Sequence, residues 1–230
     1  MKTKRLDQKI EAKFSRENEA EWPNSDRGAM LRTLDWVYDK ALAGTGAIAS
    51  AEILAYEYRK QEGTVSEQVD SLIAWQTGKA GMAGFATGLG GAVLMPLTIP
   101  ANLTSLFYLQ LRMIAAIARM GGYDPLDDRV KSLAFACLAG NTAISESLKQ
   151  VGIQVGQKLT RAAIERLSFE VVKKINQAVG FRLVTKFGST GAINLGKAVP
   201  IAGGIIGGLF DAASTRTIGK VAKRTFMVLR

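Results

Sequence analysis

Apolar residues recur every three or four positions through most of the chain, which is the period of an amphipathic α-helix. In residues 27–44 this period is carried by Leu31, Leu34, Val37, Tyr38, Ala41 and Leu42. Similar runs predict helices within residues 44–63, 64–79 and 103–122, and no strand-like alternation of apolar and polar residues persists. The pattern therefore predicts an all-α fold: a single helical bundle.

The uncharged stretch between Gly78 and Arg112 raises the question of a membrane span. Pro96 and Pro100 divide it into two segments, with Asn102 as a candidate cap for the second helix, and neither half supplies the roughly 20 apolar residues that a span needs. Glycines repeat at intervals of three and four in the first half, and again as pairs near the end of the chain (Gly78, Gly81, Gly84, Gly88, Gly91; Gly203, Gly204, Gly207, Gly208). Each costs a helix interior about 1 kcal/mol relative to alanine. We therefore expect two glycine-rich helical segments packed at or near the centre of the bundle, or inserted shallowly into a bilayer.

The remaining segments also read as helices with identifiable starts. Gly121 and Gly122 end one helix, and Asp124 followed by Pro125 predicts the N-terminus of the next. Residues 158–176 predict one basic helix with its apolar face on Ile164, Leu167, Val171 and Ile175, and residues 180–200 a short helix or an extended piece. Residues 201–230 predict a glycine-rich helix that becomes basic and amphipathic at its end.

Residues 1–26 are polar and carry charges of both signs, so we expect a peripheral arm before a helical domain over residues 27–230. No secretory signal pattern is present at the start, and Cys137, the only cysteine, has no internal partner. Both observations favour a reducing cytoplasm.

The positive charge lies almost wholly in the last third of the chain. Residues 149–230 contain 14 Lys and Arg against 3 Asp and Glu, and the net charge of the whole chain is +10. Such an excess indicates a polyanionic partner or simply a solvated basic surface. The candidate contacts are Lys158, Arg161, Lys173, Lys174, Arg216, Lys220, Lys223 and Arg224. The last four share one face of a helix, with Ile218, Val221, Ala222 and Phe226 on the other, which is typical of helices that lie on anionic membranes. Few aromatic residues accompany the basic cluster, so nucleic acid is the less favoured partner.

The chain contains no histidine, which excludes serine and cysteine nucleophiles activated by histidine and every imidazole metal site. Its glycine-rich segments lack a phosphate-loop signature, and we predict neither metal nor cofactor. An enzyme would have to use Asp124 and Asp211 as carboxylates, with Arg112 or Lys197 as the charge stabiliser. The alternative is structural: Arg112, Arg182 or Lys197 paired with Asp211, Asp124 or Glu146 inside the bundle.

The segments "GFATGLGGAVLMPLTIPANLTSLFYLQLRMIAAIARMGGYDPLDD" and "GFRLVTKFGSTGAINLGKAVPIAGGIIGGLFDAASTRTIGKVAKRTF" resemble the EcsC protein family. The family shares a Gly-rich helix, a proline turn, a Q-x-R helix, a G-Y-D-P turn and a closing P-x-x-G-G…D…T…A-K pattern, and the likeness covers residues 30–226. The resemblance implies a bacterial, helical protein at the cytoplasmic side of a membrane, and the family's namesake is encoded beside an ABC transporter. It places the family's polar positions at Gln110, Arg112, Tyr123, Asp124, Arg182, Lys186, Asn194, Lys197, Asp211 and Thr215, and implies no catalytic assignment.

These features together favour a non-enzymatic protein, cytoplasmic and peripheral to the inner membrane, that binds anionic lipid or a membrane-protein partner. Two alternatives stay open: a hydrolase that acts on a lipid or peptide through buried carboxylates, and a membrane-disrupting effector. The sequence makes no prediction of the oligomeric state.

Overall fold

The computed structural model describes residues 24–46, 48–81, 101–140, 161–187 and 202–227. These residues form eight helices and no strand, which confirms the all-α prediction. The helices are α2 (Asn24–Ala43), α3 (Ala51–Arg59), α4 (Val65–Gly81), α6 (Ala101–Met120), α7 (Asp128–Ala139), α9 (Arg161–Glu165), α10 (Phe169–Phe187) and α12 (Ala202–Phe226).

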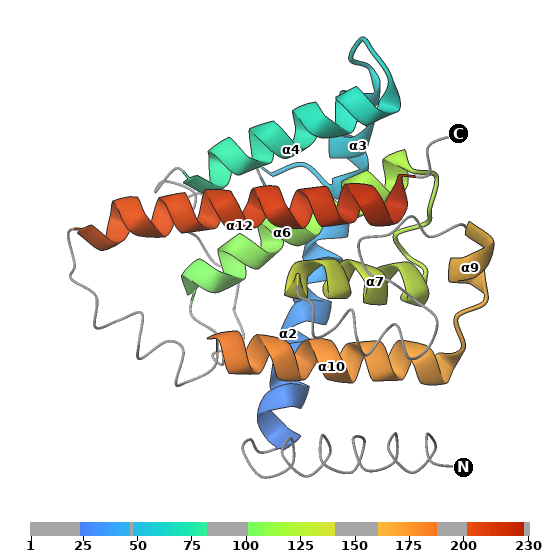
Figure 1. Ribbon diagram of the computed structural model, residues 1–230, viewed down its shortest axis with the longest axis vertical. Helices are drawn as coiled ribbons and strands as arrows, with labels where there is room; N and C mark the ends of the chain where they lie inside the picture. The colour runs from blue at the N-terminus through green and yellow to red at the C-terminus, as the bar shows by residue number, and fades with distance from the viewer. Residues whose placement is uncertain (1–23, 47, 82–100, 141–160, 188–201, 228–230) are drawn as a thin grey trace, which may run out of the picture.

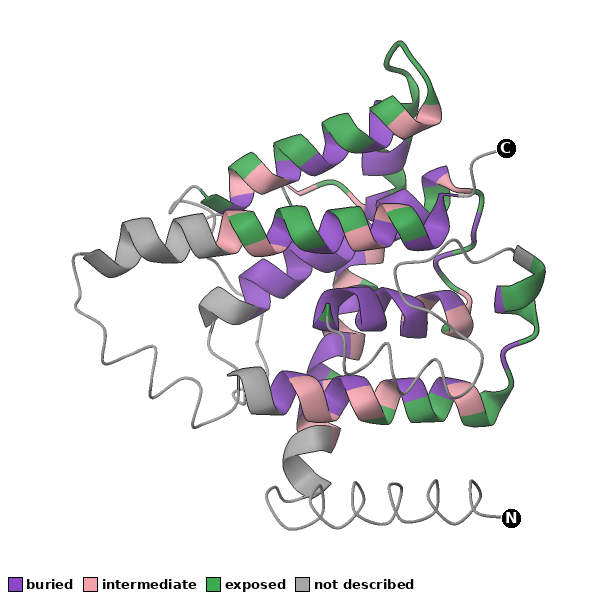
Figure 2. Cartoon of the chain, in the orientation of Figure 1, coloured by how far each residue is buried: buried purple, intermediate pink, exposed green. Residues whose placement is uncertain are grey.

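Helix α6 lies at the centre of the arrangement (Figure 1). Every side chain from Thr104 to Ala118 is buried, because α2, α3, α4, α7 and α12 all pack against this helix. Helix α12 crosses in front of α6 and runs along α4, whereas α10 packs against α2 and α7 at the lower edge of the view. The outer helices are buried only on the side that faces inward (Figure 2). Their amphipathic patterns thus correspond to one shared core.

Helix α2 follows the predicted apolar face closely. Leu34, Val37, Tyr38 and Ala41 are completely buried on it. The ring of Tyr38 meets the edge of Phe135 at 5.6 Å, and its hydroxyl donates a hydrogen bond of 3.0 Å to the carbonyl oxygen of Pro125. A buried tyrosine hydroxyl needs such an acceptor, and this one ties α2 to the turn before α7.

The starts of α4 and α6 differ by a residue or so from the predicted ones. Helix α4 begins at Val65 after a capping box, in which the amide of Thr64 donates to the Glu67 carboxylate at 2.7 Å and the amide of Glu67 donates to the Thr64 hydroxyl at 3.3 Å. These bonds lower the pKa of Glu67. Helix α6 begins at Ala101, so Asn102 lies inside the helix and is not its cap.

The prediction that Asp124 caps the helix after the Gly121-Gly122 turn is wrong. The cap is Asp127, whose carboxylate accepts from the amide of Arg129 at 2.8 Å, and α7 begins at Asp128. Asp124 lies one turn earlier and accepts from the amide of Leu126 at 3.1 Å. The stop itself is as predicted, because Gly122 adopts a φ of 86° that side chains other than glycine's rarely tolerate.

The single helix predicted for residues 158–176 is also wrong in its described part. Helix α9 ends at Glu165 and α10 begins at Phe169, where the Ser168 hydroxyl accepts from the amide of Val171 at 3.4 Å. The apolar face nevertheless stays continuous, since Ile164, Leu167 and Ile175 are all buried. Helix α10 then runs on to Phe187, through residues for which a short or extended piece was expected.

The glycine-rich segments fall largely outside the described residues. Gly84, Gly88 and Gly91 lie there, and the prediction that these segments occupy the centre stays a prediction. Gly78 is described, and a Cβ built on it would meet nothing within 4 Å. Close helix packing occurs instead at Gly219 of α12, which lies against Ile73 of α4 and Met113 of α6. Within the described ranges, no helix is both long and apolar enough to cross a membrane.

Candidate functional site

The last four turns of α12 separate exposed cations from buried apolar residues. Arg216, Lys220 and Arg224 are exposed, at positions four residues apart, and we refer to them as the α12 basic row. Ile218, Ala222 and Phe226 are buried on the inner side of the same helix. Since a spacing of four nearly closes a helical turn, the three cations follow one solvent-facing strip about 12 Å long.

Lys223, predicted to belong with these cations, has a different environment. Its ammonium group lies 2.6 Å from the Asp70 carboxylate and donates a 3.0 Å hydrogen bond to the carbonyl oxygen of Ser66. It therefore fastens α12 to α4. The three members of the α12 basic row make no ion pair within the part of the chain that the structure describes.

Cations nearer the N-terminus are neutralised by carboxylates. Arg119 contacts Glu52 at 2.6 Å, and Lys131 contacts Asp35 at 2.8 Å. Such exposed pairs contribute little to stability, but they cancel local charge. The contrast places the uncompensated positive charge of the described residues on the C-terminal helices.

The other predicted basic contacts lie elsewhere. Lys173 and Lys174 are exposed on α10, and α7 lies between α10 and α12 and contacts both (Figure 1). Arg161 opens α9, and its side chain is not described; Lys158 lies outside the described residues. The eight predicted cations therefore do not form one surface.

Among the predicted polar core residues, Gln110 joins α6 to α12. Its side-chain amide donates to the Thr215 hydroxyl at 3.0 Å and to the Ser214 hydroxyl at 3.2 Å. Gln110 and Thr215 are both buried. These bonds satisfy the polar groups that the two helices bury against each other, so the pair has a structural explanation.

Arg112 is almost completely buried, with 6 % of its surface exposed. Its Nη1 donates a 2.9 Å hydrogen bond to the carbonyl oxygen of Ala49, and Tyr108 and Tyr58 lie beside it. Burial lowers the pKa of Arg112. It pairs with no carboxylate among the described residues, so the predicted ion pairs with Asp124 and Asp211 do not form.

The two candidate catalytic carboxylates lie far from each other. The Tyr123 ring beside Asp124 contacts Phe226 at the end of α12, with the ring centroids 5.5 Å apart. Asp211 lies 15 residues before Phe226 on the same helix, which corresponds to roughly 20 Å. Asp124 is exposed, whereas Asp211 is half-buried and burial raises its pKa. The two cannot act on one substrate bond as an acid and a base.

A model of one protein family matches residues 8–228 of the chain, which is nearly its whole length. The chain belongs to the EcsC protein family. The match confirms the resemblance drawn from the sequence, and it begins within the segment predicted as a peripheral arm. Neither the curated proteins nor the solved structures supplied a match.

The remaining family positions carry less information in this EcsC protein. Arg182 is half-buried on α10, and Lys186 lies on the same helix with a side chain that is not described. Asn194, Lys197 and Glu146 fall outside the described residues.

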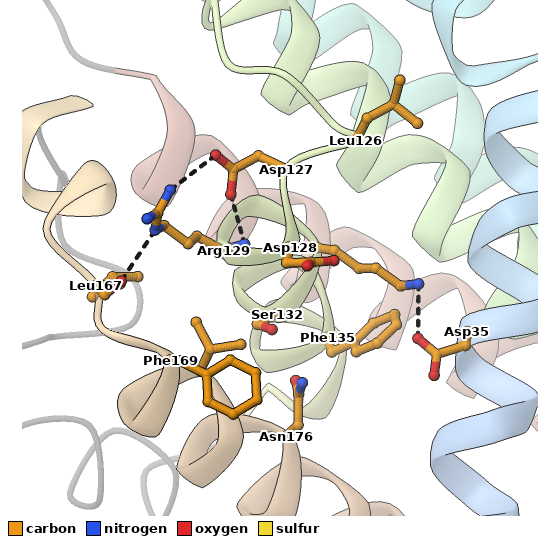
Figure 3. A pocket seen from close by; sticks show the side chains of 12 residues that line it. Asp35, Leu126, Asp127, Asp128, Arg129, Ser132, Phe135, Leu167, Phe169 and Asn176 are labelled. Carbon is orange, nitrogen blue, oxygen red and sulfur yellow. Dashed lines mark hydrogen bonds and ion pairs between the residues drawn. The ribbon is translucent and has the colours of Figure 1, made fainter.

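A hollow of about 610 Å³ between α2, α7 and α10 is absent from the sequence-based predictions (Figure 3). Ser132 and Asn176 point into it, and two strongly exposed apolar side chains, Leu126 and Phe169, lie at its rim. Its two cations, Arg129 and Lys131, are already paired with Asp127 and Asp35. In the described residues no group of His, Cys, Asp or Glu could hold a metal ion, here or elsewhere. The arrangement offers a hollow surface and no recognisable catalytic set.

Proposed function

We propose that this EcsC protein binds peripherally to an anionic membrane surface, on its cytoplasmic side, through the α12 basic row. The row itself carries the proposal: three exposed cations, four residues apart, with no carboxylate partner among the described residues. The protein acts by binding and not by catalysis, since its candidate carboxylates Asp124 and Asp211 lie at opposite ends of α12.

The expected strength of this attachment is modest. Each Lys or Arg close to an anionic lipid surface contributes about 1 kcal/mol. Three together would favour binding by about 3 kcal/mol, which is on the order of 100-fold in affinity. This attraction acts over about 8 Å at physiological ionic strength and about 3 Å in 1 M salt. Binding should therefore be reversible and sensitive to salt.

The test is flotation of the purified protein with vesicles of neutral lipid and of lipid containing phosphatidylglycerol, at low and at high salt. We expect the protein to float with the anionic vesicles at low salt only. If it stays at the bottom with every lipid, the proposal is refuted, and a membrane-protein partner becomes the better explanation. If it floats equally well in high salt, the attachment is apolar and the basic row is not its cause.

Matched charge reversals locate the contact. Lys220→Glu/Arg224→Glu and Lys173→Glu/Lys174→Glu change the net charge by the same amount, and all four side chains are exposed on helices. The first variant should lose flotation on anionic vesicles, and the second, on α10, should retain most of it. Equal losses would mean that net charge alone governs binding, which contradicts a specific role for α12.

A further inference from the structure

Arg112 lies where three helices and a turn converge. Helix α6 carries Arg112 and, one turn earlier, Tyr108; helix α3 supplies Tyr58. The turn before α3 supplies the carbonyl oxygen of Ala49, and the Thr45 hydroxyl there lies 3.4 Å from the hydroxyl of Tyr108. A guanidinium group has five N–H donors, and the one carbonyl bond to Ala49 engages only one of its nitrogens.

A second cation faces this group from α4. Lys79 is half-buried, and both burial and the nearby charge of Arg112 lower its pKa. Two positive charges are therefore held within electrostatic reach of each other in a partly dehydrated place. Such an arrangement is unfavourable unless an anion compensates it.

The protein supplies no such anion from the helices around the site. Helix α6 contains no carboxylate, and the four on α3 and α4 are engaged elsewhere: Glu52 with Arg119, Glu57 with Lys60, Glu67 with Thr64 and Asp70 with Lys223. A further donor lacks an acceptor on the turn of α4 that carries Lys79, because Nε2 of the buried Gln76 has no hydrogen-bond partner among the described residues.

We infer that Arg112, Lys79, Tyr58 and Tyr108 form a binding site for the oxyanion of a phosphomonoester. The paired cations carry a formal charge of +2, and a phosphomonoester carries about −1.5 to −2 at pH 7, with several strong acceptor oxygens. A guanidinium binds two such oxygens at once, and tyrosine hydroxyls can donate to a third. The site lies on α3, α4 and α6 and is separate from the α12 basic row.

Inorganic phosphate is the first probe. Thermal unfolding is followed as phosphate replaces chloride at constant ionic strength and pH 7.5, and we expect Tm to rise until the site is saturated. Lys79→Gln should weaken the apparent affinity by about tenfold or more, as expected for the loss of one charge-assisted contact, and Arg112→Gln should abolish the response. Lowering the pH below about 6 should weaken binding, because the anion then gains a proton.

Arg119→Gln is the matched control, because Arg119 lies two turns further along α6, is exposed and is paired with Glu52. It should retain the full response to phosphate. A wild-type protein with no saturable rise over chloride would overturn the inference. An unchanged response in Lys79→Gln would also overturn it, and this variant keeps the test informative even if Arg112→Gln fails to fold.

Two further arms identify the source of the phosphate. Vesicles containing phosphatidic acid, which has a phosphomonoester headgroup, are compared with phosphatidylglycerol vesicles of equal surface charge. A preference for phosphatidic acid that Lys79→Gln loses would identify a lipid headgroup; phosphate binding without that preference would identify a soluble phosphomonoester. Lys220→Glu/Arg224→Glu should keep its phosphate response even if it loses flotation, so the two proposals can fail separately.

Discussion

Gly219 marks the closest approach of α12 to α4, and its replacement by alanine tests how tightly these helices pack. A Cβ at this position would lie 2.9 Å from both Cγ1 and Cγ2 of Ile73 and 3.2 Å from Cε of Met113. Carbon atoms prefer separations of about 3.5–4.0 Å. The methionine end can move, but Ile73 cannot withdraw both branches, because a β-branched side chain has one strongly preferred χ1 rotamer in a helix.

The expected change is the difference of two effects. Alanine is favoured over glycine inside a helix by about 1 kcal/mol, whereas overpacking a well-filled core costs about 1–3 kcal/mol. We therefore expect Gly219→Ala to lower the free energy of unfolding by about 1 kcal/mol. Gly78→Ala is the control on α4: its Cβ would meet nothing within 4 Å, so only the helix preference applies. It should raise the free energy of unfolding by up to about 1 kcal/mol.

Urea unfolding followed by far-ultraviolet circular dichroism measures both variants, and a double-mutant cycle makes the test decisive. In an Ile73→Ala background both offending carbons are gone, so Gly219→Ala should become stabilising. The coupling energy between the two positions should be about 2 kcal/mol. If Gly219→Ala stabilises the unaltered protein as much as Gly78→Ala does, the close crossing of α4 and α12 is refuted.

Three further predictions concern single groups. Asp127→Ala should lower the free energy of unfolding by about 1 kcal/mol through loss of the α7 cap, and Asp124→Ala should lower it less; urea unfolding measures both. Burial raises the pKa of Cys137 to about 12, so the folded thiol stays protonated where the unfolded one ionises. Stability should then fall as pH rises above about 9, by up to about 1.4 kcal/mol per unit, and Cys137→Ala should flatten that fall in a pH series of unfolding curves. Burial also raises the pKa of Asp211, so its contribution to stability is present at low pH and lost as pH rises; Asp211→Asn should therefore stabilise the protein at pH 7 and make no difference near pH 3, whereas loss of stability at pH 7 would indicate an ion pair.

The sequence predicts helices well where the pattern itself decides them. Helix α2 is an example, because its buried face can be read from spacing alone. The break before α10 could not be read, since Leu167 keeps the apolar phase through it and the Ser168 hydroxyl decides where the new helix begins. Asp124 looked like the better cap because Pro125 follows it, but Tyr38 holds the carbonyl of Pro125 in the turn from 87 residues away. A long-range bond of that kind leaves no local signal.

The same distinction applies to the candidate sites. The α12 basic row was predictable, because it depends only on charge and helical spacing within one segment. Arg112 was recognised as a polar residue in an apolar run, but its neighbours Ala49 and Tyr58 come from a distant part of the chain, and its lack of a carboxylate partner is a property of the assembled helices. The glycine repeats pointed to Gly78, which meets open space, and missed the isolated Gly219, whose importance depends on Ile73.

The position of α12 in the chain has a consequence for biosynthesis. It packs along α4 and α6, yet it begins about 120 residues after α4 ends. At roughly 5–20 residues per second, a ribosome needs on the order of 10 s to make the intervening chain. During that time the faces of α4 and α6 that α12 later covers, including Ile73 and Met113, have no native cover. The nascent chain therefore presents an apolar surface for seconds, which is long enough for a chaperone to bind and release it before the last helix arrives.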